Sequence, residues 1–141
     1  MPYDRGGAIV LPSLAATGAA LDAALDLDQA AATEAAIALT MRCKGRVLGL
    51  LYTVAEAIEC STTPGVLAFH INDVEVMTMA VVDATAVDTM VMILGTLASG
   101  QNGEFEAGDV LKLEIKTRLV DAGATTGQIV PMPVVAMDQG P

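Results

Sequence analysis

Apolar and polar residues alternate with a period of two along much of the chain after residue 35. In the segment AIALTMRCK, residues 36–44, the odd-numbered positions from Ile37 to Cys43 are apolar, whereas the even-numbered positions from Ala38 to Lys44 are small or polar. An extended chain points successive side chains to opposite sides, so this pattern predicts a strand with one buried face.

The next two segments strengthen the β pattern. GRVLGLLYTV, residues 45–54, is apolar on both faces, which predicts a central strand that is buried on both faces. VLAFHINDVEVMTMAVV, residues 66–82, has two apolar arms around Asn72 and Asp73. These two residue types tolerate the left-handed backbone of a tight turn, so we expect a β-hairpin here.

Three further strands are expected in the second half of the chain, separated by the turn-like segments ASGQNG and DAGATTG. They lie in DTMVMILG (88–95), in GEFEAGDVLKLEIKTRL (103–119) and in QIVPMPVVAM (128–137). Pro131 and Pro133 lie two residues apart, so both lack an amide donor on the same edge. We therefore expect the last strand to be an outer strand or to pair with another molecule.

The total of seven or eight strands, spaced about ten residues apart, predicts an all-β fold: an antiparallel, jelly-roll-like β-sandwich. Residues 1–20 combine Pro, Gly and small residues with one short apolar run and predict an extended arm. In LDAALDLDQAAATEAA, residues 21–36, the alanines favour a helix and LDLD favours an extended chain; we expect an extended chain because everything downstream is β-like. The expected organisation is an N-terminal arm and linker over 1–34 and a sandwich domain over 35–141.

Composition excludes several classes of function. The 141 residues suffice for one domain with a single core. The net charge of −10 repels a phosphate backbone, so we expect no nucleic-acid partner. No apolar run approaches the ~18 residues of a membrane span, and no basic segment followed by an apolar one opens the chain, so we expect neither a membrane protein nor a cleaved secretion signal.

No constellation typical of catalysis or metal binding stands out. His70 lies next to the expected hairpin turn, and Asp73 and Glu75 lie across that turn, which suggests a local hydrogen bond rather than acid–base catalysis. Cys43 is expected to fill the core, and Cys60 is expected to be free. The glycines match neither the P-loop nor the dinucleotide fingerprint. We therefore expect no enzyme activity, no metal and no cofactor.

The basic residues are unevenly distributed. Apart from Arg5, all of them fall in two expected strands, and one of these strands carries Lys112, Lys116 and Arg118 on a single face. In one interpretation this face is solvated and Glu114 pairs across to a neighbouring strand. In the other, the face is a basic strip that receives an acidic segment of the arm of the same or the next subunit, for which the candidates are Asp22, Asp26 and Asp28.

The methionines point to association. Met77 and Met79, and Met90 and Met92, lie in neighbouring expected strands whose alternate positions are apolar too. Both faces of these strands are therefore expected to be buried. In a sandwich that does not associate with other molecules, one face of each sheet is exposed to solvent.

Several features follow one another in a recognisable order: an arm rich in Ala, Gly and Pro, then KGRVLGLLYTV, GVLAFHINDVEV, FEAGDVLKLEI and a last apolar strand. This order, over residues 35–137, resembles the small jelly-roll decoration or cement proteins on the heads of tailed bacteriophages. INDVEV and FEAGDVL are its most recognisable segments, and F-x-A-G-D-x-L turns also occur in C1q-like, tumour-necrosis-factor-like and carbohydrate-binding jelly rolls.

The resemblance implies a structural virion protein, made in the host cytoplasm, that binds the major capsid protein on the outer capsid surface and stabilises adjacent capsomers, commonly as a homotrimer. It implies no catalytic residues. An extended apolar arm suits such contacts, and the arm's candidate contact residues are Tyr3, Arg5, Ile9, Val10, Leu11 and Leu14. The alternative is a carbohydrate- or receptor-binding jelly-roll module, which the absence of Trp and the presence of only two Tyr and two Phe argue against. A small trimeric β enzyme would need a second His or a carboxylate pair in a cleft.

Overall fold

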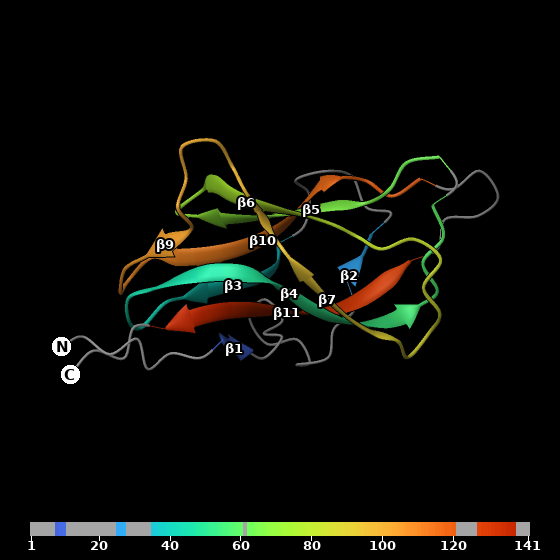
Figure 1. Cartoon of the computed structure of the whole chain (residues 1–141), viewed down its shortest axis with the longest axis horizontal. Coiled ribbons are helices and arrows are strands. Elements are labelled where there is room, and N and C mark those ends of the chain that lie inside the picture. The colour runs from blue at the N-terminus through green and yellow to red at the C-terminus, as the bar shows by residue number, and fades with distance from the viewer. Residues whose placement is uncertain (1–7, 11–24, 28–34, 61, 121–126, 138–141) are drawn as a thin grey trace.

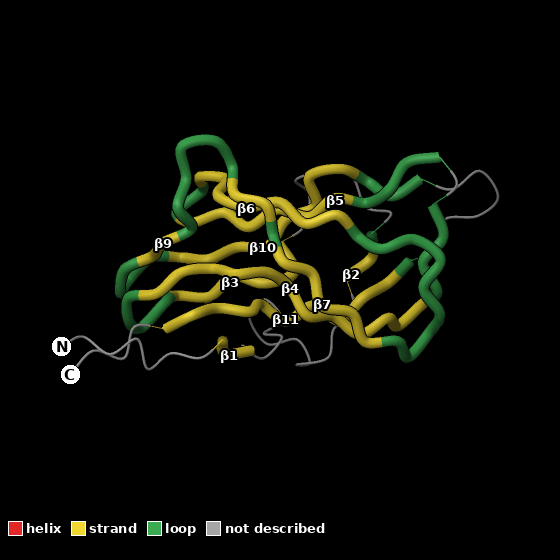
Figure 2. The backbone as a smooth tube through the Cα atoms, in the orientation of Figure 1, coloured by secondary structure: helices red, strands yellow, loops and turns green. Residues whose placement is uncertain are grey.

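The computed structural model describes residues 8–10, 25–27, 35–60, 62–120 and 127–137, and these residues form two antiparallel β-sheets (Figures 1 and 2). Sheet A contains six strands: β1 (Ala8–Val10), β11 (Gln128–Met137), β4 (Gly45–Glu56) and β7 (Met90–Leu94) in this order, with β2 (Leu25–Asp26) paired to β11 and β9 (Glu104–Phe105) paired to β4. Sheet B contains five strands in the order β3 (Ala35–Thr40), β10 (Val110–Thr117), β5 (Val66–Ile71), β6 (Val74–Ala80) and β8 (Thr96–Leu97). The described residues contain no helix, and hence none that could cross a membrane.

One hydrophobic core joins the two sheets, which makes the fold a β-sandwich. Sheet A contributes Leu50, Tyr52 and Val54 from β4, and sheet B contributes alternate residues of β10, the first of which is Leu111. All of these side chains are at most 1% exposed because the period-two pattern turns one face of each strand inward. The prediction of an all-β, antiparallel sandwich is confirmed.

The β5–β6 hairpin forms where the sequence predicts it. Asn72 and Asp73 occupy the turn with φ angles of 50° and 67°, the left-handed region that Asn and Asp adopt more readily than most residues. The strand expected over 36–44 is too long, because β3 ends at Thr40. Met41 leaves the strand to exchange backbone hydrogen bonds with the loop before β10: its N–H donates to Asp109, and its carbonyl accepts from Gly108.

The prediction that the last strand lies outermost is wrong, because β11 pairs along its length with β4 and also with β1 and β2. The two prolines nevertheless fall at a specific place on this strand. Strand β2 pairs with residues 128–129 and β1 with residues 134–136, so in the described part of the chain Pro131 and Pro133 lie in the gap between these two neighbours. A missing amide donor costs least where no partner strand needs it.

The core also includes two residues from the segment assigned to the arm. Leu25 and Leu27 are 2% and 1% exposed and pack in the core, and β2 is extended as expected for LDLD. The backbone of Leu27 donates to Gly127 and accepts from Leu119, which fixes it between two distant loops. The rest of the ambiguous block up to residue 34 lies outside the described residues.

Substitution of Gly49 by alanine tests the closeness of β4 and β7. A Cβ at Gly49 would overlap the carbonyl oxygen of Ile93, so we expect Gly49→Ala to lower the free energy of unfolding by about 1–3 kcal/mol in urea titrations. Gly65→Ala is the control, because a Cβ there meets Leu119 at an ordinary 3.4 Å. Equal stability of the two variants would contradict this packing.

Candidate functional site

The outer face of sheet B carries two lysine–carboxylate ion pairs and one histidine–carboxylate contact, which together we call the ion-pair ladder. Lys112 of β10 donates to Asp73 of the hairpin turn at 2.6 Å, and Lys116 donates to Glu75 of β6 at 2.8 Å. The third contact joins His70 and Glu114. The two lysines of the predicted basic strip therefore have acidic partners within the folded domain.

His70 contacts Glu114, not Asp73 as its position beside the turn suggested. Its Nε2 lies 3.2 Å from a carboxylate oxygen of Glu114, and the two side chains are 18% and 24% exposed. His70 lies on the outer surface of sheet B. Its cross-strand neighbours there are Lys112 of β10 and Glu75 of β6. This contact orients the imidazole.

The position of Arg118 differs from that of the lysines. It follows the end of β10 and is exposed, whereas Asp26 of the proposed acidic segment lies in β2, half-buried beside β11. Asp22 and Asp28 lie outside the described residues. For Lys112 and Lys116, the ladder favours the interpretation in which this face is solvated and its charges are paired across strands.

A second polar cluster joins the hairpin turn to the FEAGD turn. The side-chain amide of Asn72 donates to Asp109 at 2.9 Å, and its carbonyl oxygen accepts from the Val110 N–H at 2.9 Å. Asp109 also accepts from the Glu106 N–H at 2.8 Å, and Gly108 between them has a φ of 95°, which favours glycine. The segments INDVEV and FEAGDVL, which carry the resemblance, therefore bind each other.

These hydrogen bonds also tune the electrostatics of the two turns. The bond from the backbone of Glu106, and then that from Asn72, lower the pKa of Asp109 below its ordinary value of 3.8. The hydrogen bond and charge of Lys112 lower the pKa of Asp73, and Asp73 in turn raises the pKa of Lys112. Both carboxylates thus stay ionised as the pH falls toward their ordinary range.

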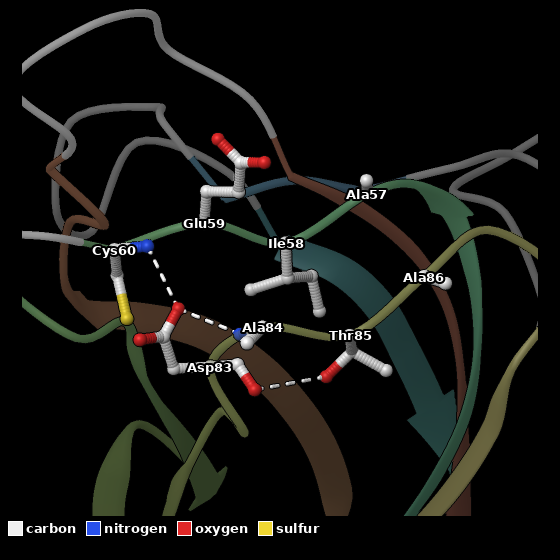
Figure 3. Close-up of a pocket in the computed structure, with 8 residues that line it drawn as sticks. All are labelled: Ala57, Ile58, Glu59, Cys60, Asp83, Ala84, Thr85 and Ala86. Atoms are coloured by element: carbon white, nitrogen blue, oxygen red, sulfur yellow. Dashed lines mark hydrogen bonds between the residues drawn. The ribbon is translucent and has the colours of Figure 1, made fainter.

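A shallow depression of about 530 Å³ lies at the loops after β4 and after β6 (Figure 3). Asp83 accepts from the backbone N–H groups of Cys60 and Ala84 at 2.9 and 2.7 Å, and the Thr85 hydroxyl donates to backbone carbonyls. The bond from Cys60 joins the two loops, and the bonds of Ala84 and Thr85 stabilise the turn within the loop after β6. Among the described residues no group of three His, Cys, Asp or Glu side chains is placed to hold a metal ion.

Both cysteines are free thiols. Cys43 does not lie in a strand as expected but in the turn between β3 and β4, where it is half-buried and its Sγ lies 3.5 Å from the sulfur of Met137. Cys60 is half-buried at the depression.

The outer face of sheet A carries a row of apolar side chains on its exposed strand β7. Met90, Met92 and Leu94 of β7, which we call the apolar strip, are 64%, 54% and 73% exposed. Met92 has Leu51 of β4 as its cross-strand neighbour, and Leu51 has Met132 of β11. A soluble domain seldom exposes such a row of large apolar side chains unless they meet a partner.

Of the predicted arm contacts, only Ile9 and Val10 lie in a described strand. Their backbones pair with Val135 and Val134 of the same chain, so this part of the arm extends sheet A. Tyr3, Arg5, Leu11 and Leu14 lie outside the described residues. The sequence had indicated the methionines, but not that Leu94 belongs with them or that β7 is the last of the described strands in its sheet.

The Asp109 cluster gives a test by pH. Because the folded-state pKa lies below the unfolded value, its contribution to the free energy of unfolding is complete above about pH 3.8 and is lost as the pH falls through the folded pKa. We expect the Asp109 carboxyl to titrate below 3.8 in an NMR titration, and Asn72→Ala, which removes one donor, to move its midpoint upward. A midpoint at or above 3.8 in the unmodified protein would contradict this geometry.

Comparisons of the chain with protein-family models, with curated proteins and with solved structures found no match.

Proposed function

We propose that the sandwich is a jelly roll. A jelly roll folds eight strands into two four-stranded sheets in which, in chain order, strands 1, 8, 3 and 6 and strands 2, 7, 4 and 5 are neighbours. With β1 taken as the first strand and the short β2, β8 and β9 set aside, sheet A has the order β1-β11-β4-β7 and sheet B the order β3-β10-β5-β6. Both orders agree with this scheme.

We further propose that the protein is a structural protein of a bacteriophage head, which binds the major capsid protein on the outer surface and stabilises adjacent capsomers. The observation that carries the proposal is the bonded pair of turns, because Asn72 and Asp109 join the two segments on which the resemblance to decoration proteins rests. The two motifs therefore belong to one structural unit of the sandwich.

The apolar strip supports a function in protein association. A protein that binds only the assembled capsid lattice stabilises it by mass action, with a gain that grows as RT ln(1 + [L]/Kd). When several copies are joined, weak contacts combine into strong binding. Such a function needs an exposed contact surface and no catalytic pocket, and self-association of the chain is part of the proposal.

A carbohydrate-binding module fits less well. Such modules stack sugar rings on exposed aromatic side chains. The aromatic residues in the described part of the chain are Tyr52, Phe69 and Phe105, and they are 0%, 0% and 1% exposed. No ring among them is available to a sugar.

Particles that contain and lack the protein provide the direct test. We expect purified phage heads without it to bind the added protein on their outer surface, as seen by electron microscopy, and to withstand a higher temperature before they release DNA. Heads that neither bind the protein nor gain thermal resistance would contradict the proposal.

Deletion of residues 1–20 tests the arm separately. Strand β1 contributes only three residue pairs to sheet A, so we expect the truncated protein to keep its fold with a small decrease in Tm. We expect it to lose binding to the capsid, measured by co-sedimentation with heads. If the truncated protein binds as well as the full chain, the arm is not the contact.

A further inference from the structure

We propose that β7 pairs with β7 of a second copy of this chain, antiparallel and across a two-fold axis at Met92, so that the two copies of sheet A become one continuous sheet. The partner is the chain itself, and the contact is a strand edge. This inference specifies how the chain associates with itself. It rests on the proposed function only because that function includes self-association.

The hydrogen bonds of β7 show which groups face outward. The Val54 N–H donates to the Thr89 carbonyl, and the Gly95 N–H donates to the Leu48 carbonyl, so the carbonyl of Thr89 and the N–H of Gly95 face β4. In an antiparallel ladder this direction alternates from residue to residue. Met90, Met92 and Leu94 therefore present their N–H and C=O groups at the opposite edge, where no described strand pairs with them.

This edge lacks the features that usually prevent edge pairing. Natural edge strands carry prolines, bulges or charged side chains, especially lysine. The chain from Thr89 to Gly103 has no proline and no charged side chain, and the pairing of β7 with β4 is regular over five residues. An apolar edge without these features is a ready template for pairing with another strand.

Charge and symmetry favour a second copy as that strand. Any contact between two copies must bring together two chains of net charge −10, and this uncharged segment is where they can approach. With Met92 on the axis, the two Asp88 side chains are eight residues apart, about 27 Å at ~3.4 Å per residue. That separation is well beyond the Debye length of about 8 Å at physiological ionic strength.

The register is self-complementary. Met92 exchanges both of its backbone hydrogen bonds with Met92 of the partner, and Met90 pairs with the partner's Leu94, so every outward group of the three residues is satisfied. The apolar strips of both copies then lie side by side on one face, where cross-strand apolar pairs stabilise a sheet. On the inner face, the half-buried Val91 and Ile93 gain cover from their counterparts.

Cysteine cross-linking measures this register in the purified protein. In a chain with Cys43 and Cys60 replaced by serine, we expect Met92→Cys to form an intermolecular disulfide on mild oxidation, because hydrogen-bonded pairs have Cα atoms about 5.5 Å apart. The controls Met90→Cys and Leu94→Cys should each cross-link at least tenfold less. Each of these residues lies at least ~14 Å from its own counterpart, four residues along the strand at ~3.4 Å per residue. A mixture of the two should cross-link.

Two further variants test the edge without new cysteines. Met92→Pro removes a donor that the single chain does not use, so the fold should persist while the dissociation constant rises at least tenfold. Met92→Lys should likewise raise the dissociation constant. The control is Val74→Lys, at a position 52% exposed on β6, which should leave association unchanged.

The unmodified protein should show a mass twice that of the 14.4 kDa chain in sedimentation equilibrium. A monomer at 100 µM, or a three-fold mass without the Met92→Cys cross-link, would overturn the inference. These experiments contain no capsid, so a paired protein that fails to bind heads would contradict the proposed function alone. Binding to heads by a protein that never cross-links would contradict the inference alone.

Discussion

Burial of the inward faces of β4 and β10 in one shared core is the constraint on which the other strands depend. Strand β4 hydrogen-bonds to β11, β7 and β9, and β10 hydrogen-bonds to β3 and β5, so these two strands position most of both sheets. Their inward side chains are almost fully buried, and each such aliphatic side chain contributes about 1.5–3 kcal/mol relative to exposure. With few aromatic residues, this core relies on many medium-sized aliphatic contacts.

The parts of the fold that could be predicted from the sequence are those whose cause is local. The alternation of β10 and the two turn residues of the β5–β6 hairpin lie within a few positions of one another, and both predictions are confirmed. The end of β3 could not be predicted, because Met41 is drawn out of the strand by backbone groups of Gly108 and Asp109. The burial of Leu27 likewise depends on hydrogen bonds to Gly127 and Leu119, which a local pattern does not contain.

In the candidate site, too, the features with a local cause could be predicted from the sequence, and those that depend on distant residues could not. The sequence located the basic residues of β10 correctly on one face, but the partners of Lys112 and Lys116 come from the β5–β6 hairpin, about forty residues earlier in the chain. The sequence pattern of one strand shows only that its lysines share a face. The carboxylates that pair with these lysines lie on another part of the sheet and become visible only in the structure. The apolar strip is the converse case: alternation identified its methionines, and only the strand order reveals that nothing described lies beyond them.

The glycine between β7 and β8 has a consequence for how the protein would respond to force. Gly95 is the single residue that joins the edge of sheet A to the edge of sheet B, and the side chain of Met77 fills the space where a Cβ would stand. Tension applied along β7 would pass directly into β8 and from there into β6. A pull at one edge would thus be resisted in shear by the hydrogen bonds of both sheets, and not by peeling of a single strand.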